Sequence, residues 1–478
     1  MFFVKIFNKD QDDMVRQIQS LNSVTYSYVR VEWKMVTGFS HSAGEKTRFM
    51  GNIHKRELLR GATALLLTTA TITGAGLLHW SASQASFQES PKEVIDEVWQ
   101  IVNRNYVDGT FNRTDWQAVR SNYLGRNYEN RQQAYKAIRE MLKKLGDPYT
   151  RFMDPEEFKD MQIQTSGELS GVGLELGKQE KTGQLVVSSP IEGSPALKAG
   201  IQSKDIIIKI DGKSTKGMDV QDAVKLIRGE SGTKIVLTVL RGSKEIDYSL
   251  VRSKIEIHPV RFHVQDTPLG SVGYIRLNQF SAQAGDEMRH AIERLEQQHV
   301  KGYILDLRSD PGGLLYAAVD IARQWLKEGT IVSTVERQGE KERYRANNLA
   351  LTDKPLVILV DGGSASASEI LSGALQDNRR AKLVGTKTFG KGLVQSVRGL
   401  ADGSGMAVTI AKYLTPSGRD INKHGIEPDV VIDLTDADRK ELQSNREKIG
   451  TLSDPQLAKS LEILKPEIEH KSSASSQR

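Results

Sequence analysis

The sequence predicts a mixed α/β, multidomain protein, and three observations support that prediction. The chain has 478 residues, which is room for about two to four domains. Hydrophobic residues make up 38% and charged residues 26% of it, as is typical of a globular protein. The apolar pattern changes along the chain from helical periodicity to short β-runs and then to alternating strands and helices. We therefore expect a helical N-terminal arm, a β-rich domain and an α/β core.

Charge and composition exclude several classes of function. Lysine and arginine number 66 and aspartate and glutamate 60, so the net charge of +6 is mild, and the basic residues are scattered. We therefore expect no nucleic-acid partner. Cysteine is absent, which excludes disulfides, a thiolate nucleophile and a cysteine-ligated metal site. We expect neither a metal nor a cofactor.

Residues 1–89 form an N-terminal extension, in which the segment 54–85 has the pattern of a secretory signal. Its run 61–78 is apolar, and small residues follow it up to Ala85. Basic residues precede the run at Lys55, Arg56 and Arg60. Basic, apolar and small residues in this order are typical of a signal peptide, so we predict export with cleavage after Ala85.

Two features of this extension leave alternatives open. At 18 residues, the apolar run is just long enough to span a membrane, so an uncleaved anchor through 61–78 is the main alternative to a cleaved signal. A buried helix is the lesser alternative, because the run is weakly periodic. Sixty residues precede the run, and Met50 lies at the usual distance from such a signal, so we assign no function to residues 1–49.

Residues 90–160 have the pattern of a small helical region. Apolar residues recur at intervals of three and four along 94–102. A second helical stretch covers 131–145 and stops at Gly146-Asp147-Pro148, which is a helix-terminating sequence.

Residues 165–256 change to short β-runs bounded by glycine turns. The predicted elements are three strands, at 185–187, 206–210 and 235–240, and two short helices, at 194–199 and 220–227.

The order of these elements resembles a PDZ domain. The matching stretches are Gly171–Leu174, Gly193–Ala196, Ala199–Ile201 and Asp205–Gly212. The resemblance implies that Gly171, Val172, Gly173 and Leu174 form a loop that binds a free carboxylate through consecutive backbone N–H groups. The neighbouring strand edge would then take up a peptide by β-addition.

Residues 260–435 alternate strands with helices, which predicts an α/β layer. The predicted strands are 271–277, 303–307 and 356–360, and the predicted helices are 284–299, 314–326 and 367–376. The last residues, 436–478, form a polar tail that we expect to be partly helical and disordered at its end.

Two corners of the α/β region, at 306–314 and 360–370, join a buried strand to a helix through glycine-rich turns. Such a corner presents unpaired backbone N–H groups and the positive end of a helix. In the second corner, Ser366 would have its hydroxyl exposed beside N–H groups that could hold an oxyanion. Helix capping is the structural alternative, because serine, aspartate and glycine are frequent at helix N-termini.

Lys391 follows the serine corner in a glycine-flanked stretch, and no acid lies between Asp377 and Asp402. A lysine that acts as a base must be neutral, so its pKa must fall from about 10.4 towards working pH. Burial would lower the pKa, and so would a neighbouring positive charge. The neighbours that we expect to do this are Phe389, Leu393, Val394 and Lys387. The alternative is a glycine turn with a solvated lysine.

The string Ser-Ala-Ser-Ala-Ser-Glu at 364–369, followed by Thr-Phe-Gly-Lys-Gly at 388–392, resembles the C-terminal processing proteases over residues 90–435. The resemblance implies a crotonase-like core of ββα units. It also implies that Ser366 is the nucleophile, that Lys391 is the general base and that Gln395 orients the lysine. The oxyanion hole would comprise the N–H groups of Ala367 and of Gly312 or Gly313.

Other candidate residues have weaker support. Asp377 matches a family acid but could equally cap its helix. Asp306 and Arg308 are better explained as a structural pair than as catalytic groups. Arg228 matches a position that couples the PDZ domain to the active site in some relatives, and a surface arginine is the alternative.

The resemblance implies an exported serine endopeptidase, in a periplasm or a thylakoid lumen, that binds protein or peptide substrates by apolar, free C-termini. A catalytically silent PDZ scaffold is the alternative from another functional class. A Ser–His–Asp protease is disfavoured, because histidines such as His258 and His424 lack a suitable serine corner as partner. Homo-oligomerisation and the physiological substrate are left open.

Overall fold

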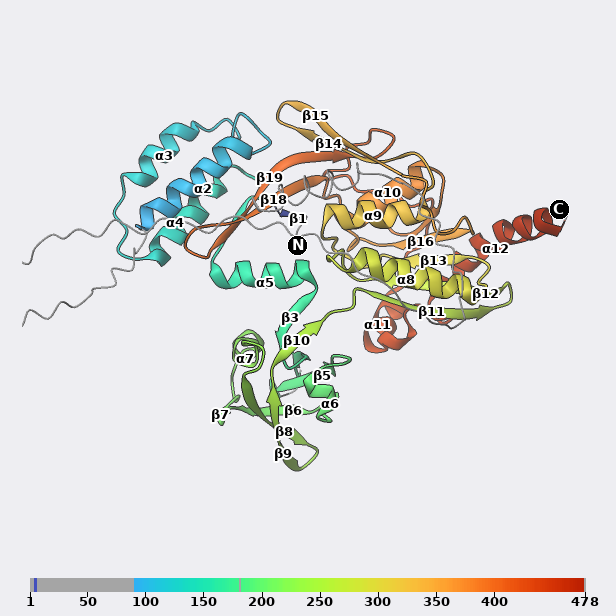
Figure 1. Cartoon of the computed structure of the whole chain (residues 1–478), viewed down its shortest axis with the longest axis horizontal. Coiled ribbons are helices and arrows are strands. Elements are labelled where there is room, and N and C mark those ends of the chain that lie inside the picture. Colours follow the sequence, from blue (N-terminus) through green and yellow to red (C-terminus); the bar gives the residue numbers. More distant parts are fainter. Residues whose placement is uncertain (1–3, 7–89, 180–181, 477–478) are drawn as a thin grey trace, which may run out of the picture. The chain divides into compact units, whose positions relative to one another are not determined.

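The computed structural model of the chain describes residues 4–6, 90–179 and 182–476 (Figure 1). The predicted signal or anchor segment 54–85 lies outside the described residues, as does nearly all of 1–49. None of the helices in the described ranges is long and apolar enough to cross a bilayer. The mixed α/β prediction is confirmed, with helices first, then a β-rich domain and then an α/β core.

The helical arm consists of α2 (Pro91–Asn105), α3 (Trp116–Leu124) and α4 (Arg131–Lys143). Their apolar faces meet in one cluster that includes Trp99 and Met141. The sequence did not predict the next element, strand β2 (Arg151–Met153), which precedes α5 (Pro155–Ser166). β2 pairs antiparallel with a core strand, so hydrogen bonds join the arm to the core sheet.

The β-rich domain, residues 165–256, has the predicted alternation of short strands and helices. Its sheet has the order β4-β5-β6-β8-β9, with β7 beside β6, and α7 packs next to the edge strand β4. The first and last strands of this region, β3 and β10, pair with each other in a separate antiparallel ladder. The bounds are β3 (Glu168–Gly171), β4 (Leu174–Lys178), β5 (Leu185–Pro190), α6 (Pro195–Lys198), β6 (Ile206–Ile210), β7 (Lys213–Ser214), α7 (Val220–Ile227), β8 (Lys234–Arg241), β9 (Lys244–Val251) and β10 (Ser253–Glu256).

The core contains a sheet of order β11-β12-β13-β16-β17-β20, parallel from β12 onwards. Alternate side chains point to opposite faces, as the two-residue period of a strand requires. One face packs on α8, α9 and α10, and the other packs on α12. The bounds are β11 (Val260–Thr267), β12 (Gly270–Leu277), α8 (Ala284–Gln297), β13 (Tyr303–Asp306), α9 (Leu315–Trp325), β16 (Leu356–Val360), α10 (Ala367–Asp377), β17 (Lys382–Gly385), β20 (Val430–Val431), α11 (Asp436–Ser444), η1 (Arg446–Lys448) and α12 (Pro455–Ser476).

A second sheet, which the sequence did not predict, has the order β1-β18-β19-β14-β15, with β2 beside β19. Helix α10 lies between the two sheets, since it contacts both β14 and β17. The bounds are β1 (Val4–Ile6), β14 (Thr330–Glu336), β15 (Gly339–Arg345), β18 (Leu393–Gly399) and β19 (Gly405–Leu414).

The C-terminal tail is partly helical, as expected, but it is also packed on the core, which the sequence did not predict. Helix α12 continues to Ser476 and buries Leu457 and Leu464 against the core sheet, and the last two residues lie outside the described residues. The buried Asp454 just before it forms an ion pair with Arg308 at 2.6 Å, and Arg308 also pairs with Asp306 at 2.6 Å. Asp306 and Arg308 are therefore structural, as the sequence predicted. The signal that was missed is the apolar period inside the polar tail.

Candidate active site

Ser366 lies at the sharp corner between β16 and α10. Its backbone, with φ of 60° and ψ of −112°, is in a region that non-glycine residues rarely occupy, and such strain is concentrated at functional sites. The hydroxyl is not exposed as predicted: Ser366 is 0% accessible. The Oγ has no hydrogen-bond partner among the residues that the structure describes.

The first corner packs directly against the second. A Cβ atom on Gly312 would lie 2.7 Å from the backbone nitrogen of Ala367 and 3.0 Å from Cβ of Ser366, so only glycine fits there. The N–H of Gly312 donates to Asp310 Oδ1 at 2.8 Å. It is therefore engaged, whereas no backbone acceptor within the described ranges takes the N–H of Gly313 or of Ala367.

Lys391 is buried, with 1% of its surface accessible. Its pKa is lowered to about 7, first by burial and then by the positive charge of Arg151, while Asp147 and Glu369 act in the opposite direction. The Nζ atom lies 4.9 Å from the centre of the Tyr149 ring. The helical arm and its following strand thus supply one wall of the lysine site.

The expected neighbours of Lys391 are partly wrong. Phe389 is 57% exposed, and Lys387 forms an exposed ion pair with Glu427 at 2.6 Å. Neither appears among the causes of the lowered pKa. No acid lies between Asp377 and Asp402 in the sequence, but two acids lie near Lys391 in the folded structure. Asp147 belongs to the helical arm, and Glu369 belongs to the serine corner.

Glu369 is a buried acid whose role the sequence did not reveal. Its Oε2 accepts the N–H groups of Ser366 and Lys391, each at 2.8 Å. Its Oε1 accepts the N–H of Gly390 at 2.7 Å and the hydroxyl of Thr388 at 2.6 Å. Burial raises the pKa of Glu369, and these hydrogen bonds oppose the rise. One carboxylate therefore ties the serine corner to the lysine loop.

A second link between the two loops is Tyr413 of β19, which the sequence analysis also missed. Its hydroxyl lies 2.7 Å from the carbonyl oxygen of Lys391 and 3.1 Å from that of Ser366. The clue available in the sequence was only a tyrosine in a strand-like run.

Gln395 is fully buried at the start of β18, four residues after the lysine. Its Nε2 donates to the hydroxyl of Thr409 at 3.3 Å, and that hydroxyl donates to Asp147 at 2.6 Å. Its Oε1 has no partner in the described part of the chain. A polar chain thus runs from the helical arm to Gln395.

The predicted PDZ residues lie at the entry to β4. Gly171 ends β3, Val172 is buried, and Leu174 begins β4 at the sheet edge. No backbone acceptor among the described residues takes the N–H of Val172 or Gly173. Arg228, directly after α7, forms an ion pair with Asp160 of α5.

The other candidate residues in the described ranges form no hydrogen bond with Ser366 Oγ. Asp377 ends α10, accepts the hydroxyl of Ser417 at 2.7 Å and pairs with Arg419. His258 is bonded to Glu287 at 2.6 Å. His424 is exposed. No histidine among the described residues is hydrogen-bonded to Ser366 Oγ.

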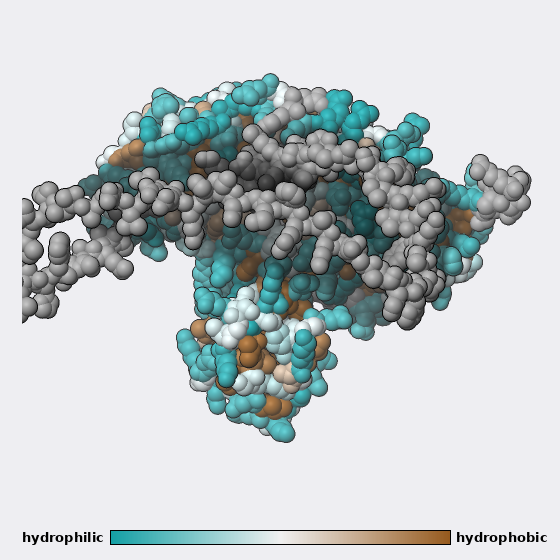
Figure 2. All heavy atoms as spheres, viewed as in Figure 1, coloured by the Kyte–Doolittle hydropathy of each residue, from teal (hydrophilic) through white to brown (hydrophobic). Residues whose placement is uncertain are grey.

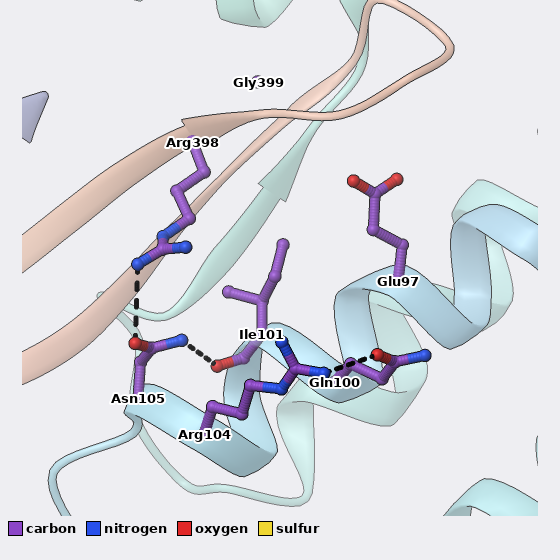
Figure 3. A pocket seen from close by; sticks show the side chains of 7 residues that line it. All are labelled: Glu97, Gln100, Ile101, Arg104, Asn105, Arg398 and Gly399. Atoms are coloured by element: carbon purple, nitrogen blue, oxygen red, sulfur yellow. Dashed lines mark hydrogen bonds between the residues drawn. The ribbon is translucent and has the colours of Figure 1, made fainter. Parts of the chain in front are cut away.

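A cavity of about 400 Å³ lies between α2 and the end of β18 (Figure 3). It is lined mainly by polar and charged side chains, including Glu97, Arg104 and Arg398. None of the predicted site residues lines it, so it does not belong to the serine–lysine site. Among the described residues, no group of histidine, aspartate and glutamate side chains could hold a metal ion.

Three family models match the chain. These are peptidase family S41 over residues 271–432, a PDZ domain over 186–241 and the tricorn protease C1 domain over 87–126.

Named relatives cover most of the chain. A carboxyl-terminal-processing protease of Synechocystis sp. is 50% identical over 354 residues, which is 73% of this chain and 83% of the relative. Carboxyl-terminal-processing peptidase 3, chloroplastic, of Arabidopsis thaliana is 40% identical over 370 residues, covering 74% of this chain and 71% of the relative. A solved structure of a photosystem II D1 C-terminal processing protease is 37% identical, with a TM-score of 0.51, and covers 77% of this chain and 100% of that one.

The fold and these similarities define a serine peptidase with a PDZ domain. The chain belongs to peptidase family S41, among the carboxyl-terminal-processing proteases. This membership disfavours the alternative of a silent scaffold.

The Glu369 contacts generate a prediction. Glu369→Gln replaces one acceptor oxygen with an amide that points at N–H donors, so the serine corner and the lysine loop should separate. Because a hydrogen bond to a charged group contributes about 1.5–3 kcal/mol, we expect peptide cleavage to fall by roughly 10- to 100-fold. Steady-state kinetics and circular dichroism would measure activity and fold. The matched control is Glu427→Gln, a change at an exposed ion pair, which should leave kcat unchanged. Equal activity of both variants would contradict the role of Glu369.

Proposed function

We propose that the chain is an endopeptidase that cleaves near the C-termini of substrate proteins by a Ser–Lys acyl-enzyme mechanism. Ser366 is the nucleophile, Lys391 is the general base and Gln395 orients the lysine. The N–H groups of Gly313 and Ala367 form the oxyanion hole, because the N–H of Gly312 is engaged by Asp310.

The reaction has two halves. Neutral Lys391 takes the proton of Ser366 as Oγ attacks the scissile carbonyl carbon, and the carbonyl oxygen becomes an oxyanion held by backbone N–H groups. Collapse of this intermediate expels the amine, which receives the proton from Lys391 and leaves an acyl-enzyme. Water, deprotonated by Lys391, then attacks the ester carbonyl carbon. The second intermediate collapses, Lys391 returns the proton to Ser366 Oγ, and the carboxylic acid product leaves.

The observation that carries this proposal is the burial of Lys391, which lowers its pKa to about 7. A lysine with its ordinary pKa would be almost fully protonated at neutral pH and could not act as a base. The Ser366 Oγ has no hydrogen-bond partner among the described residues. A catalytic hydrogen bond often forms only in the complex with substrate, so this geometry is compatible with the proposed pair.

We predict that activity rises with pH through about 7, because the neutral form of Lys391 is the active one and is populated above its pKa. Arginine keeps the charge but does not deprotonate in a protein, so Lys391→Arg should lower kcat by roughly 100- to 10,000-fold, as should Lys391→Ala. Peptide cleavage would be compared among these variants, the wild type and Ser366→Ala, with circular dichroism as the fold control. Appreciable cleavage by a folded Lys391→Arg variant would rule out lysine as the base.

We further propose that the PDZ domain recognises apolar C-termini. The loop Gly171–Leu174 offers N–H groups for a carboxylate, and the free edge of β4 offers a ladder for a peptide strand beside α7. Hydrophobic residues gather on the visible face of this domain (Figure 2). Leu226, on α7, is 37% exposed. Such a surface suits an apolar peptide end.

This proposal predicts that a free carboxylate is required for binding. The full-length Ser366→Ala variant should bind a peptide with an apolar C-terminal residue, and amidation of that terminus should lower the affinity by roughly tenfold or more, because charge-assisted hydrogen bonds are lost. Fluorescence anisotropy would measure both affinities. A peptide with a charged C-terminal residue serves as the specificity control. Equal binding of the acid and amide forms would remove the recognition claim and leave the protease mechanism intact.

We also propose that the protein is exported, to a periplasm or a thylakoid lumen. The segment 54–85 has a signal pattern, and relatives include cyanobacterial and chloroplast proteins. N-terminal sequencing of the protein from cells should give a mature chain that begins near Ser86. A chain that begins at Met1 or Met50 would instead support an uncleaved anchor.

A further inference from the structure

Asp310 joins the two corners of the active site. It lies in the turn between β13 and α9, and its backbone carbonyl accepts the N–H of Ala365 at 3.0 Å and the hydroxyl of Ser368 at 2.8 Å. Both donors flank Ser366 on the other corner. The position of the Asp310 peptide is therefore set relative to the nucleophile.

The side chain of Asp310 is fully buried, and only one of its two carboxyl oxygens has a hydrogen-bond partner among the described residues. Its Oδ1 accepts the N–H of Gly312 at 2.8 Å, whereas its Oδ2 has no hydrogen-bond partner among the described residues. An ionised carboxylate with one unsolvated oxygen is costly in a protein interior. A protonated acid avoids that cost, because the proton resides on the oxygen that lacks a partner.

The surroundings of Asp310 favour the neutral acid. Burial raises its pKa well above the ordinary range, and the negative charge of Asp306 at the end of β13 adds to the rise. The N–H of Gly312 opposes the rise, as do the hydroxyl of Ser368 and the positive charge of Arg276 on β12. Arg276 is, however, already bound to Asp306 at 3.1 Å, which reduces its effect on a second carboxyl.

Gly312 links Asp310 to Ser366. Its N–H donates to Asp310, and it packs against Ser366 and precedes Gly313, so a change in the protonation of Asp310 would shift this turn. We propose that Asp310 acts as a neutral carboxylic acid that positions the turn of Gly312 and Gly313 against Ser366, and that loss of its proton disables the site. A negative charge beside the turn would oppose the oxyanion that develops there. The catalytic part of this inference rests on the proposed oxyanion hole, and the structural part does not.

The catalytic test compares Asp310→Asn with Asp310→Ala. The asparagine keeps the acceptor for Gly312 and cannot ionise, so kcat/KM should stay within about threefold of the wild type at neutral pH. At alkaline pH the wild type should lose activity and Asp310→Asn should keep it. Asp310→Ala loses the acceptor and should lose about tenfold or more in kcat at every pH. If the wild type and Asp310→Asn lost cleavage activity in parallel as the pH rises into the alkaline range, the inference would be overturned.

A second test does not depend on catalysis. The folded protein retains a proton that the unfolded chain releases above a pH of about 4, so wild-type stability should fall as pH rises towards the pKa of Asp310 in the folded state. In urea unfolding between about pH 5 and pH 8, the unfolding constant of the wild type relative to Asp310→Asn should grow by up to about tenfold per pH unit.

The two tests separate the possible failures. If the ratio of the unfolding constants of the wild type and Asp310→Asn did not change with pH, the neutral-acid assignment would be overturned. Failure of Asp310→Asn to fold would overturn it too, because an amide should fit a site built for an uncharged group. If cleavage persisted in Lys391→Arg while the ratio still grew with pH, the proposed mechanism would fail and the neutral Asp310 would stand.

Discussion

The candidate active site depends on a buried carboxylate, that of Glu369, which holds the loops of Ser366 and Lys391 together. Ser366, Thr388, Gly390 and Lys391 all donate to it. Without this acceptor, four buried donors would lose their partner, and each unsatisfied group costs about 1–3 kcal/mol. The hydroxyl of Tyr413 provides a complementary donor for the carbonyl groups of Ser366 and Lys391. The positions of the proposed nucleophile, Ser366, and the proposed base, Lys391, are thus set through their backbones.

Burial sets the chemical state of the site as well as its shape. The same low-polarity environment lowers the pKa of Lys391 and raises those of Glu369 and Asp310, because it disfavours any charged form. A buried lysine that loses its proton becomes a base. A buried aspartate that keeps its proton becomes an uncharged hydrogen-bonding group. Opposite shifts from one cause therefore suit the proposed roles, which are a base at Lys391 and an uncharged acid near the proposed oxyanion hole.

The helical arm helps to build the candidate active site. Strand β2 adds to the core sheet, Tyr149 lies over Lys391, and the Asp147 carboxylate reaches Gln395 through Thr409. The tail makes a comparable contribution on the opposite face of the main sheet, where Asp454 and α12 secure Arg308 behind the first corner. Segments that appear peripheral in the sequence therefore fix the positions of the two corners.

The sequence by itself determined the fold class, most elements of the main sheet and the positions of Ser366 and Lys391, because these depend on local periodicity, glycine turns and short motifs. The second sheet, the packing of the tail and the roles of Glu369, Tyr413 and Asp147 were decided only by the tertiary structure. The physical reason is distance along the chain. Asp147 lies more than two hundred residues from Lys391, so no local pattern could place a charge beside the lysine. The protonation states of the site depend on burial and on such long-range contacts, and these exist only after the chain has folded.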